Sequence, residues 1–165
     1  MILFSQTLSS PIGDLFALAD ENSLLFLDFA DSREQNKKLQ SQYQRYSLHQ
    51  KNDILIETEK ELSEYFAGTR KIFSIPIEFH GSNFQEKSWK WLQDIPYGET
   101  RSYQEQANQI WSPTAVRAIG WANHNNPIII IIPCHRVIGK RGKLIGYSGW
   151  LDRKIWLLEH EKKYK

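Results

Sequence analysis

The segment SYQEQANQIWSPTAVRAIGWAN, residues 102–123, carries two helix-start signals ten residues apart. Ser102 is followed three positions later by a glutamate, the pattern of a capping box, and Ser112 precedes a proline that suits the first position of a helix. These signals predict helices over residues 102–110 and 113–123, with about two residues between them. Two short helices joined in this way have the outline of a helix-turn-helix.

The segments around this motif complete a mainly helical second half. A capping box at Ser82 predicts a helix that ends before Pro96. The isoleucine run 128–132 is expected to be a buried strand or extended segment, and the glycine-rich residues 139–150 a loop or ribbon. An amphipathic helix is predicted over residues 152–162.

The first half is predicted to hold a small sheet and one helix. Short apolar runs separated by turn residues predict strands, and an amphipathic stretch that stops at Gly68 predicts a helix over residues 54–67. Residues 71–79 read as a further strand, at an edge because of Pro76. The polar segment 32–53 is expected to be surface helix or loop. The three N-terminal strands are expected over residues 2–8, 15–20 and 23–30.

We therefore expect an α/β (α+β) fold in two domains. Residues 1–79 would form a support domain with a small sheet. Residues 80–165 would form a mainly helical, winged-helix-like domain that contains the helix-turn-helix and the reactive chemistry.

Composition and motifs limit the class of protein. With 165 residues, 41% hydrophobic and 24% charged, the chain is expected to be a soluble globular protein. Its longest apolar run is far shorter than the roughly 20 residues of a membrane span. The N-terminus lacks the pattern of a signal peptide. One cysteine excludes an internal disulfide and multi-cysteine metal sites, so we expect a cytoplasmic protein.

Charge is divided unevenly along the chain. Residues 1–100 hold 10 Lys and Arg against 15 Asp and Glu, whereas residues 101–165 hold 11 against 4. A basic half beside an acidic half is typical of a nucleic-acid-binding domain next to a support domain. A solvated basic surface with a lysine-rich tail is the alternative.

The single cysteine lies in IIIIIPCHRVIGK, residues 128–140. A free cysteine most often fills space in a core. Here a proline ends the isoleucine run directly before Cys134, and His135 and Arg136 follow it. A packing site would avoid these polar neighbours, but a reactive thiolate would use them. The pattern therefore favours a nucleophilic cysteine.

A cysteine nucleophile needs a base and a group that orients the base. Neighbouring side chains in an extended segment point apart, so we expect a contact between Cys134 and His135 to run through a water. Glu161 and Glu159, on the last predicted helix, are candidates for the orienting carboxylate. Both can equally be exposed helix charges.

Four segments in order, FQEKSWKWLQDIPYGETRSYQEQA, PTAVRAIGWANHNNP, IIPCHRVIG and GYSGWLDRKIWLLEHE, resemble the O6-alkylguanine-DNA alkyltransferases. The resemblance is close over residues 80–161. It is weaker in the N-terminal segments SPIGDLFALADENSLLFLDF and LSEYFAG. The PCHR segment, with RAIG before it and GYSG after it, is a specific combination.

The resemblance implies a DNA repair reaction. Such proteins bind duplex DNA containing O6-alkylguanine through the minor groove, flip the damaged nucleotide out of the helix and move its alkyl group onto cysteine. Cys134 would be the acceptor, His135 would activate it through a water, and Glu161 would hold His135. Asn126 would brace the active-site turn. Tyr103 would lie by the 3′ phosphate and favour departure of the guanine.

The resemblance also assigns DNA and pocket contacts. Arg117 would be the finger that fills the space left by the flipped base. The Val137 carbonyl and the Ser148 N–H would read the guanine, and Tyr147 and Gly149 would wall the alkyl pocket. Further DNA contacts would come from Thr114, Ala115, Ala118 and Asn123.

Several positions depart from the family pattern. Trp111 replaces the usual glycine after the first helix of the motif, and Trp150 replaces the second glycine after GYSG. His124 and Asn125 stand where small residues are common, beside the expected DNA face.

Nothing in the sequence indicates a cofactor, and with one cysteine the chain cannot form the cysteine-rich zinc site of some relatives, so we expect no metal. We expect a monomer, and O4-alkylthymine in DNA is a second candidate substrate. Two other functions compete with repair. A cysteine hydrolase would use Cys134 and His135 but leaves the helix-turn-helix unexplained. A module that binds alkylated bases without repairing them would not need the cysteine that is present.

Overall fold

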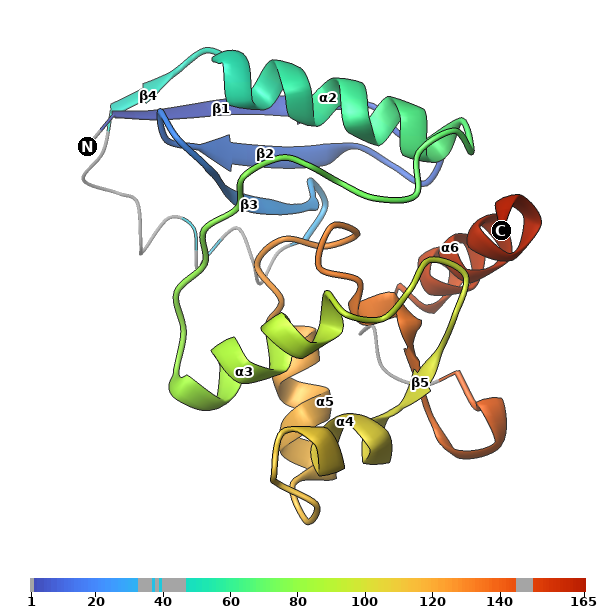
Figure 1. Cartoon of the computed structure of the whole chain (residues 1–165). Coiled ribbons are helices and arrows are strands. Elements are labelled where there is room, and N and C mark those ends of the chain that lie inside the picture. Colours follow the sequence, from blue (N-terminus) through green and yellow to red (C-terminus); the bar gives the residue numbers. More distant parts are fainter. Residues whose placement is uncertain (1, 33–36, 38, 40–46, 145–149) are drawn as a thin grey trace. The chain divides into compact units, whose positions relative to one another are not determined.

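A computed structural model describes residues 2–32, 37, 39, 47–144 and 150–165 (Figure 1). The chain divides into two units, Met1–Phe79 and His80–Lys165. Within the part of the chain that is described, no helix is long and apolar enough to cross a membrane.

The N-terminal unit is a four-stranded sheet with the helix α2 (Asp53–Phe66) packed against it (Figure 1). The strand order is β3-β2-β1-β4, with β1–β2 and β2–β3 antiparallel and β4 parallel to β1. The predicted helix and the three N-terminal strands are confirmed, whereas the short β4 was not predicted. Most of the polar segment 32–53 lies outside the described residues. The strands are β1 (Ile2–Leu8), β2 (Leu15–Ala19), β3 (Leu24–Phe29) and β4 (Ser47–His49).

Burial explains why these residues form a sheet and a helix. Every residue of β2 except Phe16 is buried, and Leu55, Leu62 and Tyr65 present the buried face of α2. The N-cap of α2 is Asn52, whose side chain accepts a hydrogen bond from the Leu55 N–H at 3.1 Å.

The strand predicted over residues 71–79 is wrong. Only an isolated bridge joins Leu24 to Ile77, with the Leu24 N–H donating to the Pro76 carbonyl at 2.9 Å and the Glu78 N–H donating to the Leu24 carbonyl at 3.0 Å. Because Pro76 has no N–H, it cannot extend the ladder.

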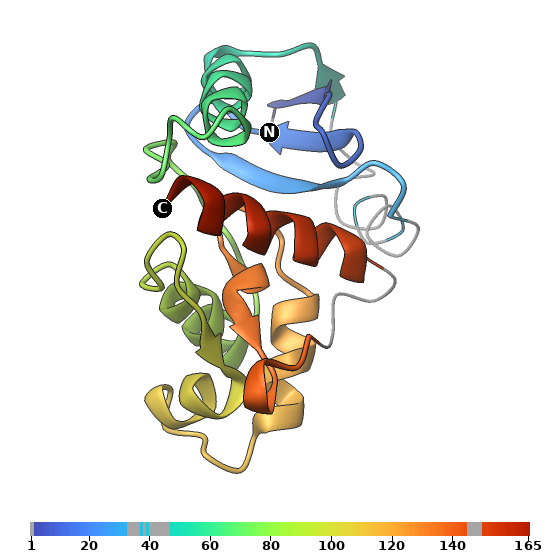
Figure 2. The ribbon, with the colours of Figure 1, turned by 90° about the vertical axis from the view of Figure 1, so that its right-hand side faces the viewer.

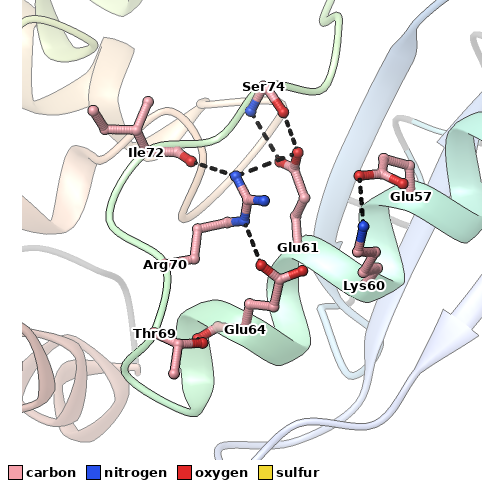
Figure 3. A network of polar contacts seen from close by, with 8 residues as sticks. All are labelled: Glu57, Lys60, Glu61, Glu64, Thr69, Arg70, Ile72 and Ser74. Carbon is pink, nitrogen blue, oxygen red and sulfur yellow. Dashed lines mark hydrogen bonds and ion pairs between the residues drawn. The ribbon is translucent and has the colours of Figure 1, made fainter.

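A buried carboxylate ties this segment to α2 (Figure 3). Glu61 is fully buried and accepts hydrogen bonds from both the N–H and the hydroxyl of Ser74. Arg70 lies 3.5 Å from Glu61 and 3.1 Å from Glu64, and its guanidinium donates to the Ile72 carbonyl at 2.8 Å. The segment after α2 is therefore held by polar contacts to Glu61 and Glu64 and by the isolated bridge to Leu24, and not by a β-ladder.

Replacing Glu61 with glutamine should destabilise the N-terminal unit by about 2 kcal/mol, because an amide NH2 would face the Ser74 donors. Urea unfolding followed by far-UV circular dichroism measures the loss; all six tryptophans lie in residues 80–165, so their fluorescence reports on the other unit. Glu57→Gln is the control, since its pair with Lys60 spans 3.8 Å on the surface. Equal unfolding midpoints in the two variants would contradict this role of Glu61.

The C-terminal unit is mainly helical, and both predicted capping boxes are confirmed. Ser82 caps α3 and Ser102 caps α4, each with the reciprocal side-chain bond from the residue three positions later. Helices α3, α4 and α5 contact one another, α6 contacts the reactive turn, and α4 and α5 form the predicted pair (Figure 2). The helices are α3 (Asn83–Leu92), α4 (Tyr103–Gln109), α5 (Val116–His124) and α6 (Leu151–Tyr164).

The link between α4 and α5 is longer than predicted. The second helix begins at Val116 after the N-cap Ala115, which makes no side-chain cap, so the prediction of a cap at Ser112 is wrong. The residues between form a turn in which the Ala115 N–H donates to the Ser112 carbonyl at 2.9 Å. Trp111 takes a positive φ of 62°, the left-handed conformation that ends α4.

The isoleucine run is buried but is a tight loop and not a strand. Ile130 has a φ of 72°, and the Ile132 N–H donates back to the Ile128 carbonyl at 3.0 Å. The loop leads into the 3-10 helix η1 (Cys134–Arg136) and the strand β6 (Val137–Ile138). This strand pairs in parallel with β5 (Arg101–Ser102), directly before α4.

Candidate active site

Cys134 is the first residue of a single buried turn. The Cys134 N–H donates to the Ile132 carbonyl at 2.8 Å, and the Arg136 N–H donates to the Pro133 carbonyl at 3.0 Å. The exposed fractions of Cys134, His135 and Arg136 are 4%, 0% and 6%. One short turn therefore holds a thiol, an imidazole and a guanidinium away from water.

The buried carboxylate of Glu161 on α6 joins these groups. Its Oε1 lies 2.7 Å from the Nε2 of His135, and both of its oxygens accept from the Arg136 guanidinium, at 2.9 and 2.8 Å. The Gly98 N–H adds a bond of 3.2 Å, and Arg136 also donates to the Ile95 carbonyl at 2.7 Å. Two-point binding by a guanidinium is the strongest way to hold a carboxylate. The other candidate, Glu159, is exposed.

These contacts set the charges of the pair. Burial lowers the pKa of His135, and the positive charges of Arg136 and Lys154 lower it further. Glu161 acts in the opposite direction but does not outweigh burial. For Glu161, burial alone would raise the pKa, but His135 and Arg136 outweigh it and hold the pKa well below 4.5. The two pKa shifts imply different charges on His135. The lowered pKa of His135 favours a neutral ring, whereas the lowered pKa of Glu161 rests in part on a charged ring. Arg136 is permanently charged, so we assign an anionic Glu161 and a neutral His135.

A neutral His135 that donates Nε2–H to Glu161 has a lone pair on Nδ1. Within the described residues this buried Nδ1 has no hydrogen-bond partner. The imidazole can therefore accept a proton on the side of the ring away from Glu161.

Lys154, which was not predicted, lies between Tyr103 and the reactive turn. Its buried Nζ donates to the Val137 carbonyl at 2.6 Å and to the Tyr103 hydroxyl at 3.4 Å. Burial lowers the pKa of Lys154 to about 8, although the Cys134 charge opposes this. Burial and the Cys134 charge raise the pKa of Tyr103 to about 12. Both groups are thus close enough to respond to a thiolate.

A signal for Lys154 is present in the sequence. Lys154 and Glu161 are seven residues apart, so they lie on the same face of α6 two turns from each other. The predicted orienting carboxylate on that face could have drawn attention to the lysine.

Asn126 closes the isoleucine loop. Its side chain donates to the Ile132 carbonyl at 2.7 Å and accepts from the Ile128 N–H at 3.0 Å. These bonds span the loop that delivers Cys134, which supports the predicted bracing role.

The helix-turn-helix exposes most of the predicted DNA contacts. Thr114, Arg117 and Ala118 are exposed, and Ala115 is half-buried. The predicted DNA contact of Asn123 must be corrected. This residue is 6% exposed, and its side chain exchanges two hydrogen bonds with Gln106, at 2.9 and 2.8 Å. This buried amide pair fixes α5 to α4, and its burial keeps the Asn123 side chain away from DNA.

The remaining predicted positions are placed as follows. Tyr147, Ser148 and Gly149 lie outside the described residues. The Val137 carbonyl already accepts from Lys154. Trp111 is 91% exposed at the end of α4. Among the described residues, no group of three acidic, histidine or cysteine side chains could hold a metal.

Acid should reveal the contribution of Glu161 to stability. Because its folded pKa lies below the unfolded value near 4.5, the anion stabilises the fold above about pH 4.5, and this contribution is lost as the pH falls further. Glu161→Gln should cost about 3 kcal/mol at pH 7, since it leaves Arg136 buried without its counter-charge. The deficit relative to the parent protein should shrink toward pH 2. Urea unfolding over this pH range, with the exposed Glu159→Gln as control, tests this; a deficit that stays constant with pH would contradict it.

The sequences of both units match known protein families. Residues 83–163 match the family described as the DNA binding domain of 6-O-methylguanine DNA methyltransferase, and residues 3–79 match the family described as its ribonuclease-like domain. The methylated-DNA–protein-cysteine methyltransferase of Mycobacterium leprae is 42% identical over 161 residues, which cover 98% of this chain and 93% of the relative. The constitutive enzyme of that name from Bacillus subtilis is 43% identical over 159 residues, covering 94% and 93%.

A solved structure agrees with these relatives. The crystal structure of Mycobacterium tuberculosis OGT in complex with DNA superposes with a TM-score of 0.86 at 41% identity, covering 98% of this chain and 94% of that one. The chain therefore belongs to the 6-O-methylguanine DNA methyltransferase family, the methylated-DNA–protein-cysteine methyltransferases.

Proposed function

We propose that this protein repairs DNA by moving the alkyl group of O6-alkylguanine onto the sulfur of Cys134, once per molecule. The observation that carries the proposal is the 2.7 Å contact between His135 Nε2 and Glu161, which leaves the opposite ring nitrogen of a neutral imidazole to serve the neighbouring cysteine. Family membership supports the substrate, since the relatives are named methylated-DNA–protein-cysteine methyltransferases.

Activation of the thiol follows from this geometry. Nδ1 of His135 accepts the Cys134 proton through a bridging water, and Glu161 stabilises the imidazole as it gains charge. Lys154 adds a buried positive charge that favours the thiolate. The O4-alkyl group of thymine is a further possible substrate of the same thiolate.

The transfer is a displacement at the alkyl carbon. The thiolate forms the S–C bond, the C–O6 bond breaks, and the electron pair passes to O6. The proton that left the thiol returns to the guanine, so the products are S-alkylcysteine and guanine. A thioether is not cleaved by water, and the reaction therefore ends after one transfer.

The leaving guanine needs a donor as negative charge develops on it. Tyr103 remains a neutral phenol, because burial and Cys134 raise its pKa to about 12, and it can donate a hydrogen bond to the base. Lys154 lies 3.4 Å from this hydroxyl and polarises it. By family resemblance, the alkyl pocket would also include Val137, Tyr147, Ser148 and Gly149.

DNA binding falls to the basic C-terminal unit. The exposed Thr114, Arg117 and Ala118 would enter the minor groove, with Arg117 filling the space of the flipped nucleotide. Extrusion costs a few kcal/mol and least for a weakly paired lesion, which contributes to selectivity. The N-terminal unit, residues 1–79, would act as support, and we expect a cytoplasmic monomer.

Methyl transfer should stop at one equivalent per protein. Incubation with excess duplex that contains O6-methylguanine should add one CH2 to the intact mass, located on Cys134 by peptide mapping. Cys134→Ser should show no gain yet bind duplex with nearly unchanged affinity, since the sulfur makes no phosphate contact. Multiple turnovers would instead indicate a hydrolase and would overturn the proposal.

Arg117→Ala should slow repair in duplex DNA far more than reaction with free O6-methylguanine, because the free base needs no extrusion. We expect at least a tenfold difference between the two effects, equivalent to about 1.4 kcal/mol of lost stabilisation of the flipped state. Single-turnover rates on both substrates give the comparison. Equal losses would mean that Arg117 supports the pocket, and no loss on duplex would remove it from flipping.

Lys154→Met should move the pH at which Cys134 alkylation reaches half its maximal rate upward, because a buried positive charge beside the thiolate is lost. At pH 7 the rate with free O6-methylguanine should fall about tenfold or more. Rates between pH 6 and 10, with circular dichroism as a check of folding, provide the test. A uniformly lower rate with an unchanged pH profile would assign Lys154 to structure alone.

A further inference from the structure

Residues 96–99 form a turn directly before β5 whose side chains the proposed chemistry does not use. The Glu99 N–H donates to the Pro96 carbonyl at 3.1 Å, and Gly98 at the third position has a φ of 76°. A Cβ added at Gly98 would meet the Lys165 side chain at 2.9 to 3.2 Å. Figures 1 and 2 both draw this yellow-green segment beside the C-terminal end of α6. The backbone angle and the close approach of α6 both require a glycine here.

The turn and the residue before it contact both members of the buried ion pair. The Gly98 N–H donates to Oε2 of Glu161 at 3.2 Å, and the Ile95 carbonyl accepts from Nη1 of Arg136 at 2.7 Å. The Tyr97 ring adds a third contact, with its centroid 5.7 Å from Cζ of Arg136. The face of an aromatic ring attracts a guanidinium, and the attraction is stronger where water is excluded.

Tyr97 contributes its ring to this contact and no charge. The residue is half-buried, and burial followed by the charge of Glu161 raises its pKa. Tyr164 on α6 acts in the same direction, whereas Arg136 lowers the pKa of Tyr97 without outweighing the other influences. The hydroxyl therefore stays protonated at neutral pH, and a phenylalanine ring would cover the guanidinium equally well.

We propose that Tyr97 is a positioning residue that keeps His135 neutral. Its ring holds Arg136 on Glu161 and covers this ion pair from water. The proposal rests on the proposed repair function, in which only a neutral His135 can accept the proton of Cys134.

Loss of the ring would favour a proton on His135. Water would reach the ion pair and weaken the burial of the imidazole, which is the largest influence on its pKa. A less firmly held Arg136 would oppose protonation less and would neutralise Glu161 less completely. Water would also screen Glu161, which acts the other way but against the largest influence. Lys154, the remaining charge that acts on His135, keeps its bond to the Val137 carbonyl.

The variant Tyr97→Leu tests the proposal through the pH dependence of methyl transfer. Single-turnover rates with free O6-methylguanine are measured from pH 5.5 to 8.5, with circular dichroism at each pH as a check of folding. The ratio of the variant rate to the parent rate should be about tenfold smaller at pH 5.5 than at pH 8. A ratio that does not change with pH would overturn the proposal and leave the ring with a packing role alone. Tyr97→Met replaces the leucine variant if the latter does not fold.

Two further variants serve as controls. Tyr97→Phe keeps the ring and should restore the parent pH profile; a profile like that of Tyr97→Leu would assign the effect to the hydroxyl and overturn the proposal. Trp91→Leu removes a half-buried ring that packs against the cluster of Ala107, Ile110 and Ile119. It should lower the unfolding temperature and leave the pH profile in place. An equal change of profile in Trp91→Leu would mean that any loosening of the unit is sufficient, which would also overturn the proposal.

Nitrogen-15 spectra of His135 separate this proposal from the repair function. Between pH 5.5 and 8, the ring should gain its second hydrogen at a higher pH in Tyr97→Leu than in the parent protein. Identical titrations would reject the role of Tyr97 even if the parent protein accepts methyl groups. Absence of methyl transfer to the parent protein would reject the repair function, whereas the comparison of the two titrations would still stand.

Discussion

The active site depends on one buried carboxylate. Glu161 accepts hydrogen bonds from His135, from both sides of the Arg136 guanidinium and from the Gly98 backbone, so it joins η1, α6 and the segment before β5. Such a carboxylate is stable only while Arg136 neutralises it, and Arg136 in turn is buried only because Glu161 is there. Because Arg136 already neutralises Glu161, His135 does not need to be positively charged. A neutral, oriented imidazole beside Cys134 is the result.

One face of α6 supplies two opposite charges to the site. Glu161 acts on the imidazole, and Lys154, two turns earlier, acts on the Tyr103 hydroxyl and the Val137 carbonyl. In the proposed mechanism the anion stabilises a proton on His135, and the cation stabilises negative charge on the sulfur and on the departing base. Because both side chains stand on one rigid helix, their separation is set by helical geometry and not by loop conformation.

The sequence predicted those features that depend on local chemistry. Capping boxes at Ser82 and Ser102 need only residues three apart, and both helices begin where the boxes indicated. The predicted start of the second helix was wrong, because the left-handed Trp111 and the turn after it occupy the residues that were predicted to cap that helix. Residues 128–132 have the composition of a strand, yet the Asn126 side chain folds them into a loop, a contact that periodicity does not reveal. Burial of Asn123 against Gln106 and the place of Lys154 likewise arise from tertiary packing.

Activation of Cys134 by a neutral His135 is tested by the protonation state of the His135 ring. Nitrogen-15 spectra of histidine-labelled protein at pH 7, with the His135 signals assigned by their loss in His135→Asn, report which ring nitrogen carries hydrogen. We predict a neutral ring with hydrogen on Nε2 and a bare Nδ1 facing away from Glu161. A ring protonated on Nδ1, or an imidazolium at this pH, would contradict it, because Nδ1 could then not accept the proton of Cys134.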